Sequence, residues 1–295
     1  MKHLSGVDSA FLHLESPEMP MHIGSLNVVD LPEGYTGDFF EDTKAHIQQR
    51  MHLADVFTRK LMLMPLDVSN PVWVEDEDID IDYHVRHVTL PKPGSNRQLQ
   101  QYVARLHSSL LDRSRPLWEF FVIDGLKSRQ VALYCKVHHA GLDGQAGVAV
   151  AKAIFDLEPT GRAIKAPRPR GRREHYQLGV AELLGAAVRN TLNQSVGLVK
   201  SLPLIARSAK AALIPAKGVN GKREWSLPKD FKIFAPRTSL NVAITNQRTF
   251  AGRTVPLSEV KQIAKALGVS LNDVVMATTA GALRAYLKYN NELPD

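Results

Sequence analysis

Cysteine is nearly absent from this sequence of 295 residues, in which Cys135 is the only one. A single thiol cannot form an internal disulfide, and it cannot build a cluster of cysteine ligands around a metal. The sequence therefore excludes a small secreted scaffold held by disulfides. It is consistent with a reducing compartment such as the cytoplasm.

Long hydrophobic runs are also missing. No window of about 18 uninterrupted apolar residues occurs, which is the length expected of a membrane-spanning helix. Lys2, His3 and Asp8 stand where a secretory signal would have its apolar region. If the protein meets a membrane, we therefore expect it to do so from the surface.

Several short motifs of catalysis and metal binding are absent as well. The sequence has no Gly-x-Ser-x-Gly turn of a serine hydrolase and no glycine pattern that cradles a nucleotide phosphate. The acidic run at 75–78 lacks the ligand spacing and the central glycine of a calcium loop, which favours a solvated strand face. We expect no metal site.

The residues that are present have an ordinary globular composition, 44% hydrophobic and 7% aromatic. At this length we expect two cores, or one core with part of another. The formal net charge of +7 indicates an anionic partner. That partner is a polyanion or an anionic surface, and nucleic acid is only one candidate.

Periodicity predicts alternating helices and strands in an N-terminal domain at 1–165. Helices are predicted at 5–15, 38–52, 96–111 and from 148 to about 157. Strands are predicted at 21–29, within 72–90 where residues 79–85 alternate, at 119–124 and at 130–138. The last two strands are expected to pair as an antiparallel hairpin.

A basic segment at 166–235 follows the first domain. Arginines and prolines without acids are typical of a linker at 162–173, and 178–214 is a long basic helix-forming stretch that Pro203 kinks or divides. This stretch has two interpretations that are not exclusive: an amphipathic helix in a lipid interface, or an interdomain helix packed on the protein. Residues 236–295 then begin a second domain, with a strand region at 242–250 and helices at 257–267 and from 271 onward.

The candidate chemistry lies at the end of the strand predicted at 130–138. The sequence there continues as His138-His139-Ala-Gly-Leu-Asp143-Gly144. Two packed or surface histidines are one interpretation, and a metal site is a second, although adjacent histidines on a strand point to opposite faces. The third is a general base, because a histidine at a strand end accepts a proton near neutral pH.

A family resemblance favours the third interpretation. His-His-x-x-x-Asp-Gly at 138–144 resembles the signature of the CoA-dependent acyltransferase superfamily. Four other segments are similar, in order, to bacterial wax ester synthase/acyl-CoA:diacylglycerol acyltransferases: Leu4-Ser-Gly-Val-Asp-Ser-Ala-Phe11, Pro20-Met-His-Ile-Gly24, Pro116-Leu117-Trp118-Glu119 and Ser270-Leu-Asn272-Asp273. The resemblance implies an α+β fold like that of chloramphenicol acetyltransferase, an α/β two-layer sandwich.

The resemblance also implies a reaction and a role for each motif residue. His139 would be the general base that deprotonates a fatty alcohol or a diacylglycerol for direct attack on acyl-CoA, which is a substrate, so that no cofactor is needed. His138 would support the motif, Asp143 would orient it and Gly144 would allow its turn. Asn272 and Asp273 would form a second motif, although helix capping explains them equally. Pro116, Leu117 and Trp118 would line an acyl channel, or simply pack in the core.

Two other functions use the same features. A condensation-type enzyme would transfer the acyl group to a carrier-bound amine, and a non-catalytic protein of lipid inclusions would keep the basic helix without an intact base. Members of the family continue well beyond 295 residues. The resemblance therefore implies a complete N-terminal domain with the first part of a second similar domain, and a C-terminal half of the same protein as a partner in a complete site. It also implies a cytoplasmic protein that is peripherally associated with the inner membrane or with lipid inclusions. Its partner would then be that membrane or lipid-inclusion surface, and no nucleic acid.

Overall fold

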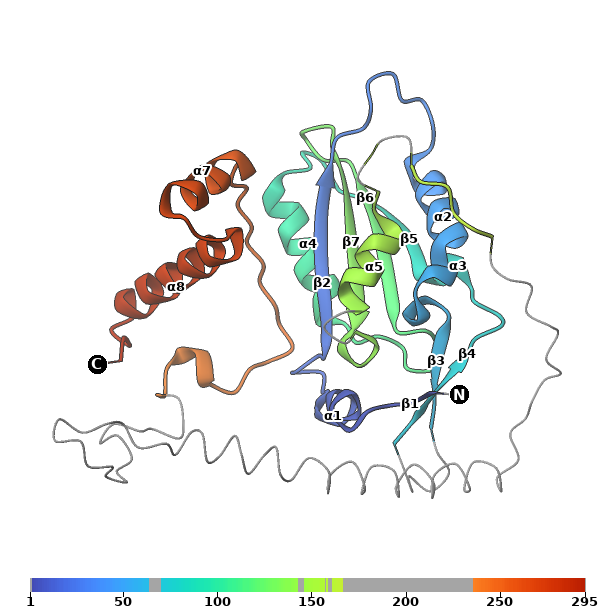
Figure 1. The fold of residues 1–295 in the computed structure, drawn as a ribbon, viewed down its shortest axis with the longest axis horizontal. Coiled ribbons are helices and arrows are strands. Elements are labelled where there is room, and N and C mark those ends of the chain that lie inside the picture. The colour runs from blue at the N-terminus through green and yellow to red at the C-terminus, as the bar shows by residue number, and fades with distance from the viewer. Residues whose placement is uncertain are drawn as a thin grey trace. The chain divides into compact units, whose positions relative to one another are not determined.

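A four-stranded mixed sheet forms the centre of the larger part of this computed structural model (Figure 1). The structure describes residues 2–63, 70–142, 146–156, 158, 161–166 and 236–294. Contacts divide the chain into two units, which are Met1–Ser201 with Thr245–Phe250, and Leu202–Ile244 with Ala251–Asp295. Each unit is described by itself.

The sheet of the first unit has the strand order β2-β7-β6-β5. Its strands are β2 (His22–Val29), β7 (Val131–His138), β6 (Trp118–Asp124) and β5 (Val85–Thr89). The hairpin predicted between β6 and β7 is confirmed, since the two pair antiparallel, and β7 also pairs antiparallel with β2. β5 pairs parallel with β6. Because β7 is central, the histidines at its end are held from both sides.

Helices cover both faces of this sheet (Figure 1). α2 (Phe39–Arg50) and α5 (Ala146–Ile154) pack on the face that holds Val131, Leu133 and Val137 of β7. α4 (Asn96–Ser108) packs on the other face, which holds Ala132 and Tyr134. Successive strand residues point to opposite faces, so the mostly apolar run of β7 supplies both cores. The predicted α+β class is confirmed.

A smaller sheet and the first helix form a third cluster near the end of β7. The sheet order is β1-β4-β3, from β1 (Lys2–His3), β4 (Val72–Glu75) and β3 (Arg59–Met62). α1 (Gly6–Leu14) is capped by Ser5, whose hydroxyl accepts from the N–H of Asp8 at 3.1 Å. The buried residues of this cluster are Leu4, Leu12, Leu61, Trp73, Leu111, Leu117 and Ala140. They join α1 to the turn that follows β7.

In the described residues of the second unit there are two α-helices, and the sequence predicts both. α7 (Leu257–Leu267) ends at Gly268, which has a φ of 65° and caps the helix in the left-handed region. α8 (Leu271–Tyr289) begins after Ser270, which forms a capping box with Asp273. Among the described residues no single helix is long and apolar enough to cross a membrane. α7 and α8, bent by 102° at their junction, meet that criterion together by length and composition alone.

Two predicted strand segments are wrong. The alternation at 79–85 forms no strand before Val85, where β5 begins, because Asp80 accepts from the N–H groups of Asp82 and Tyr83 and starts the one-turn helix α3 (Ile81–His84). Residues 242–250 have no strand either, and within the described residues of this region no neighbouring strand is present to pair with them. The 3-10 turn η5 (Ser239–Asn241) precedes this stretch. The predicted helix at 178–214 lies outside the described residues.

Candidate active site

The two histidines at the end of β7 are held by the backbones of both neighbouring segments. The N–H of His138 donates to the carbonyl of Leu117 at 3.0 Å, and the N–H of His139 donates to the carbonyl of Met21 at 2.8 Å. The chain then turns through η4 (His139–Gly141). A strand end anchored on both sides gives a rigid support for side-chain chemistry.

The ring of His138 is fully buried and contacts its own turn. Its Nδ1 accepts from the N–H of Ala140 at 3.0 Å, and its Nε2 lies 3.2 Å from Oε1 of Glu15. An imidazole that accepts at Nδ1 carries its proton on Nε2 when neutral. That proton then lies on the nitrogen 3.2 Å from the carboxylate of Glu15, a contact whose angle falls outside that of a hydrogen bond.

Glu15 follows α1 and is the main site residue that the sequence did not indicate. Its side chain is 1% exposed, and its other oxygen, Oε2, accepts from Nε and a terminal nitrogen of Arg113 at 3.1 and 2.8 Å. The N–H of Met21 donates to Oε1 at 3.1 Å. Burial favours the neutral acid, but His138, Arg113 and Met21 together stabilise the anion and lower the pKa of Glu15 to about 2.

His139 is half-buried and its ring stacks on Phe11 of α1, with centroids 4.0 Å apart and planes 21° apart. Its Nδ1 is enclosed by protein and has no hydrogen-bond partner among the described residues. The turn thus directs one ring fully inward, that of His138, and leaves the other half-buried.

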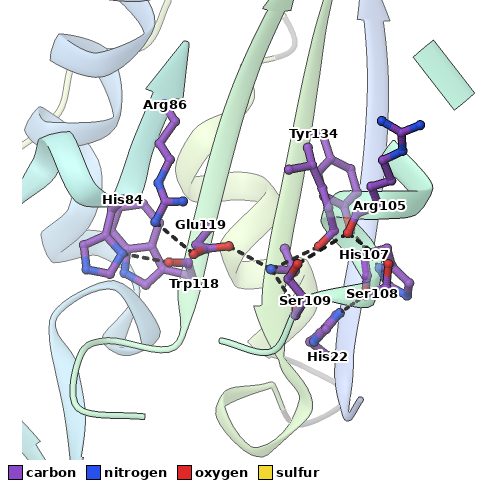
Figure 2. Close-up of polar contacts among 12 residues, drawn as sticks. His22, His84, Arg86, Arg105, His107, Ser108, Ser109, Trp118, Glu119 and Tyr134 are labelled. Atoms are coloured by element: carbon purple, nitrogen blue, oxygen red, sulfur yellow. Dashed lines mark hydrogen bonds and ion pairs between the residues drawn. The ribbon is translucent and has the colours of Figure 1, made fainter. Parts of the chain in front are cut away.

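A buried polar network lies on the α4 face of the sheet (Figure 2). Nε2 of His22 donates to the carbonyl of His107 at 2.7 Å, and Nδ1 of His107 shares a hydrogen bond of 2.8 Å with the hydroxyl of Tyr134. His22 is the cross-strand partner of His138. Burial is the main cause that lowers the pKa of His22 to about 4, so the ring is neutral at neutral pH.

A buried ion pair extends this network across the sheet. Nζ of Lys136 lies 2.8 Å from Glu119, its cross-strand partner, with side chains 1% and 7% exposed. Lys136 also donates to the carbonyls of Leu106 and Ser109 at the C-terminal end of α4. Arg86 contacts Glu119 at 3.2 Å. Burial lowers the pKa of Lys136, and Glu119 opposes that shift.

The other predicted site residues divide into three groups. Pro116, Leu117 and Trp118 are buried, and Trp118 donates from its ring nitrogen to the carbonyl of Phe57 at 3.1 Å. They are core residues, and Leu117 additionally anchors His138. Asn272 and Asp273 lie at the start of α8 in the second unit, where Asp273 accepts from Ser270. Asp143 and Gly144 lie outside the described residues.

A surface cavity of about 570 Å³ is separate from these histidines. It is lined by residues of α2, by Asp76, Glu77, Ile79 and Ile81, and by 164–166. None of its lining residues belongs to α1 or to the histidine motif, so the motif and not this cavity is the candidate active site. Among the described residues, no group of three or more histidine, cysteine, aspartate or glutamate side chains is arranged to hold a metal ion.

The sequence matches the family model of the wax ester synthase/diacylglycerol acyltransferase catalytic domain over residues 4–275, and the chain belongs to this family.

Named relatives and a solved structure agree with this assignment. The chain is 35% identical to a probable diacylglycerol O-acyltransferase of Mycobacterium tuberculosis, over 98% of this chain and 61% of that protein. It is 31% identical to the O-acyltransferase WSD of Acinetobacter baylyi, over 100% of this chain and 61% of that protein. It resembles the wax ester synthase/diacylglycerol acyltransferase structure from Marinobacter aquaeolei, with a TM-score of 0.63 and 33% identity over 99% of this chain and 62% of that one. The chain thus spans about three fifths of the length of these relatives.

Proposed function

We propose that the protein is an O-acyltransferase that moves a long-chain acyl group from acyl-CoA to a fatty alcohol or a diacylglycerol, giving a wax ester or a triacylglycerol. The observation that carries this proposal is the second histidine of the motif, half-buried at the rigid end of β7 with its Nδ1 enclosed. The family match and the activities for which the relatives are named support the substrate class.

In this proposal His139 is the general base of a direct transfer. Its Nε2 takes the proton from the acceptor hydroxyl as the oxygen attacks the thioester carbonyl. The new C–O bond forms, the C–S bond breaks, and the imidazolium returns the proton to the CoA thiolate. No acyl-enzyme is formed, and acyl-CoA is consumed as a substrate rather than held as a cofactor.

The remaining motif residues have supporting roles in the proposal. His138 holds the turn through Ala140, Asp143 orients the motif and Gly144 permits its bend. Leu117 and its neighbours Pro116 and Trp118 brace the strand end from the core. We also propose that Asn272 and Asp273 act near the acceptor in addition to starting α8, and that further chain, of the kind that the relatives possess, completes the site.

The proposal places the reaction at a membrane or lipid-inclusion surface in the cytoplasm, because both acyl-CoA and the acceptors partition there. Net positive charge supports this location, since it attracts anionic headgroups and the phosphates of CoA.

The decisive test is thiol release from palmitoyl-CoA on addition of hexadecanol or a diacylglycerol, with identification of the ester. The wild-type protein should release CoA with either acceptor. His139→Ala should lower the rate roughly 100-fold or more, the range in which a general base acts. His13→Gln is the matched control, because His13 is exposed on α1 and should leave the rate unchanged.

Two other outcomes would replace this proposal. Product formed only with an amine on a carrier would indicate a condensation-type enzyme. No product with any acceptor, together with binding to lipid inclusions, would indicate a non-catalytic lipid-binding protein.

A further inference from the structure

We propose that Glu15 is a positioning residue for the histidine pair, and that α1 is the element that presents both rings to the reaction. This inference rests on the proposed function, because it assigns a role in the same acyl transfer. Glu15 touches no reacting atom in the proposal and acts through His138 and Met21.

One carboxylate oxygen of Glu15 reaches both histidines by different routes. Oε1 lies 3.2 Å from Nε2 of His138, which is a direct contact. The same oxygen accepts from the N–H of Met21 at 3.1 Å, and the carbonyl of Met21 accepts from the N–H of His139 at 2.8 Å. Glu15 therefore contacts the ring of one histidine and is linked, through the backbone of the single residue Met21, to the backbone of the other.

The carboxylate is itself held in place. Arg113 binds Oε2 through two nitrogens and also donates to the carbonyl of Leu12 at 2.7 Å, inside α1. This fixes the guanidinium to the helix, and the planar group then fixes the carboxylate. The side chain of Glu15 is buried, whereas that of Arg113 is 41% exposed.

α1 adds a second contact to the same pair. Phe11 precedes Glu15 by four residues, which places the two side chains on one side of α1 and the turn that follows it. Phe11 stacks on the ring of His139 while Glu15 contacts the ring of His138. The inward histidine is thereby locked and the outward histidine is held flat against α1, which is the rigid support that a base needs for alignment.

The test is steady-state acyl transfer by Glu15→Gln in the whole protein, with exposed Glu18→Gln as the matched control. Glu15→Gln keeps the shape of the side chain and removes its charge. We expect kcat to fall roughly 10- to 100-fold, the effect typical of losing an outer partner of an imidazole, with the KM for acyl-CoA unchanged within about twofold. Equal kcat, or a rise in KM that accounts for the loss, would overturn the inference.

A double variant tests whether Glu15 acts through His138. His138→Asn keeps an acceptor for the N–H of Ala140 and removes the group that faces Glu15. The double variant should be no slower than His138→Asn alone, whereas multiplied losses would show independent effects and overturn the inference. If Glu15→Gln does not fold, Arg113→Gln on the exposed side takes its place, with the same expected fall in kcat.

Hydrogen exchange of the Ala140 amide tests the contact without any activity. We expect exchange roughly tenfold faster in Glu15→Gln than in wild type or Glu18→Gln, because His138 loses its anchor. An unchanged rate would overturn the inference. If the wild-type protein transfers no acyl group, the proposed function fails, and the exchange rate still decides whether Glu15 holds the turn.

Discussion

Gly24 lies where the ring of Tyr134 crosses β2 beside the histidine network. A Cβ added at Gly24 would stand 2.7 Å from the hydroxyl oxygen of Tyr134 and 3.0 Å from Nδ1 of His107. Tyr134 is buried in the core and cannot move aside without losing packing. The glycine of the Pro-Met-His-Ile-Gly segment is therefore explained by space and not by backbone conformation.

Gly24→Ala should destabilise the protein by about 1 to 3 kcal/mol, because the added methyl overpacks a well-filled site. The free energy of unfolding in urea measures this loss. Gly6→Ala in α1 is the control, since nothing lies within 4 Å of its added Cβ, and it should be neutral or slightly stabilising. Equal stability of the two variants would contradict the packing argument.

His22 should make the protein sensitive to mild acid. In the unfolded chain its pKa is near 6.5, and in the fold burial lowers it to about 4. On acidification the unfolded state therefore binds the proton first. The stability that neutral His22 contributes is fully present above pH 6.5 and is lost as the pH falls from 6.5 through about 4. Between these two pKa values the free energy of unfolding should fall by roughly 1.4 kcal/mol for each pH unit of acidification.

Unfolding free energies of wild type and His22→Gln across this pH range measure the effect. The variant should have a shallower slope, because glutamine still donates to the carbonyl of His107 but does not titrate. Some slope should remain, since burial also lowers the pKa of His84 and of His107. Parallel slopes in the two proteins would show that His22 is not the group responsible.

At the scale of elements, the pair of Lys136 and Glu119 connects β7, β6 and the end of α4. A helix leaves its last carbonyls without partners, and Lys136 supplies donors to two of them from the neighbouring sheet. The pair thus fixes the end of α4 against the strand that carries the histidines.

Lys136→Met should cost about 3 to 5 kcal/mol, because it leaves the carboxylate of Glu119 buried beside a partly exposed Arg86. Adding Glu119→Gln to this variant should recover part of the loss, since the uncompensated charge is removed. Urea unfolding of the single and double variants gives the coupling energy. Exposed Lys127→Met is the control, and its free energy of unfolding should lie within about 0.5 kcal/mol of wild type. A double variant less stable than both single variants would contradict the assignment of a buried ion pair.

The start of α8 has a capping role that is separable from a catalytic one. Ser270→Ala removes the hydroxyl that accepts from the N–H of Asp273 and should cost about 0.5 to 2 kcal/mol of helix stability. Asp273→Ala removes the other half of the same capping box. If the second motif acts in catalysis, Asp273→Ala loses acyl transfer well beyond Ser270→Ala. Equal rates would leave capping as the whole role.

At the scale of the whole molecule, the excess of cations predicts a salt-sensitive attachment to anionic lipid. The protein should sediment with vesicles that contain phosphatidylglycerol, and much less with vesicles of phosphatidylcholine alone. Raising the salt concentration should release it, because screening shortens the range of the attraction. Equal binding to both vesicles at all salt concentrations would argue against an electrostatic surface.

The secondary structure could be predicted where local chemistry decides it. Asp38 before α2, Gly268 after α7 and Ser270 with Asp273 cap helices close to the predicted bounds, and the apolar periods of α4, β6 and β7 gave the correct element types. The prediction failed at 79–85, where the alternation indicated a strand and the Asp80 cap started a helical turn instead. It also failed at 242–250, because a strand depends on a partner and not on its own residues.

By itself the sequence determined the family, the histidine pair and the positions of most helices and strands, because motifs and periodicity are written in consecutive residues. Only the tertiary structure decided which side chains surround that pair. Glu15 and Arg113 are separated by 98 positions in the chain, and His138 lies further still, so no local pattern connects them. The network around Lys136 is of the same kind, since its members meet only after β6, β7 and α4 have packed. Burial, which sets the charge states of these groups, is a property of the packed chain alone.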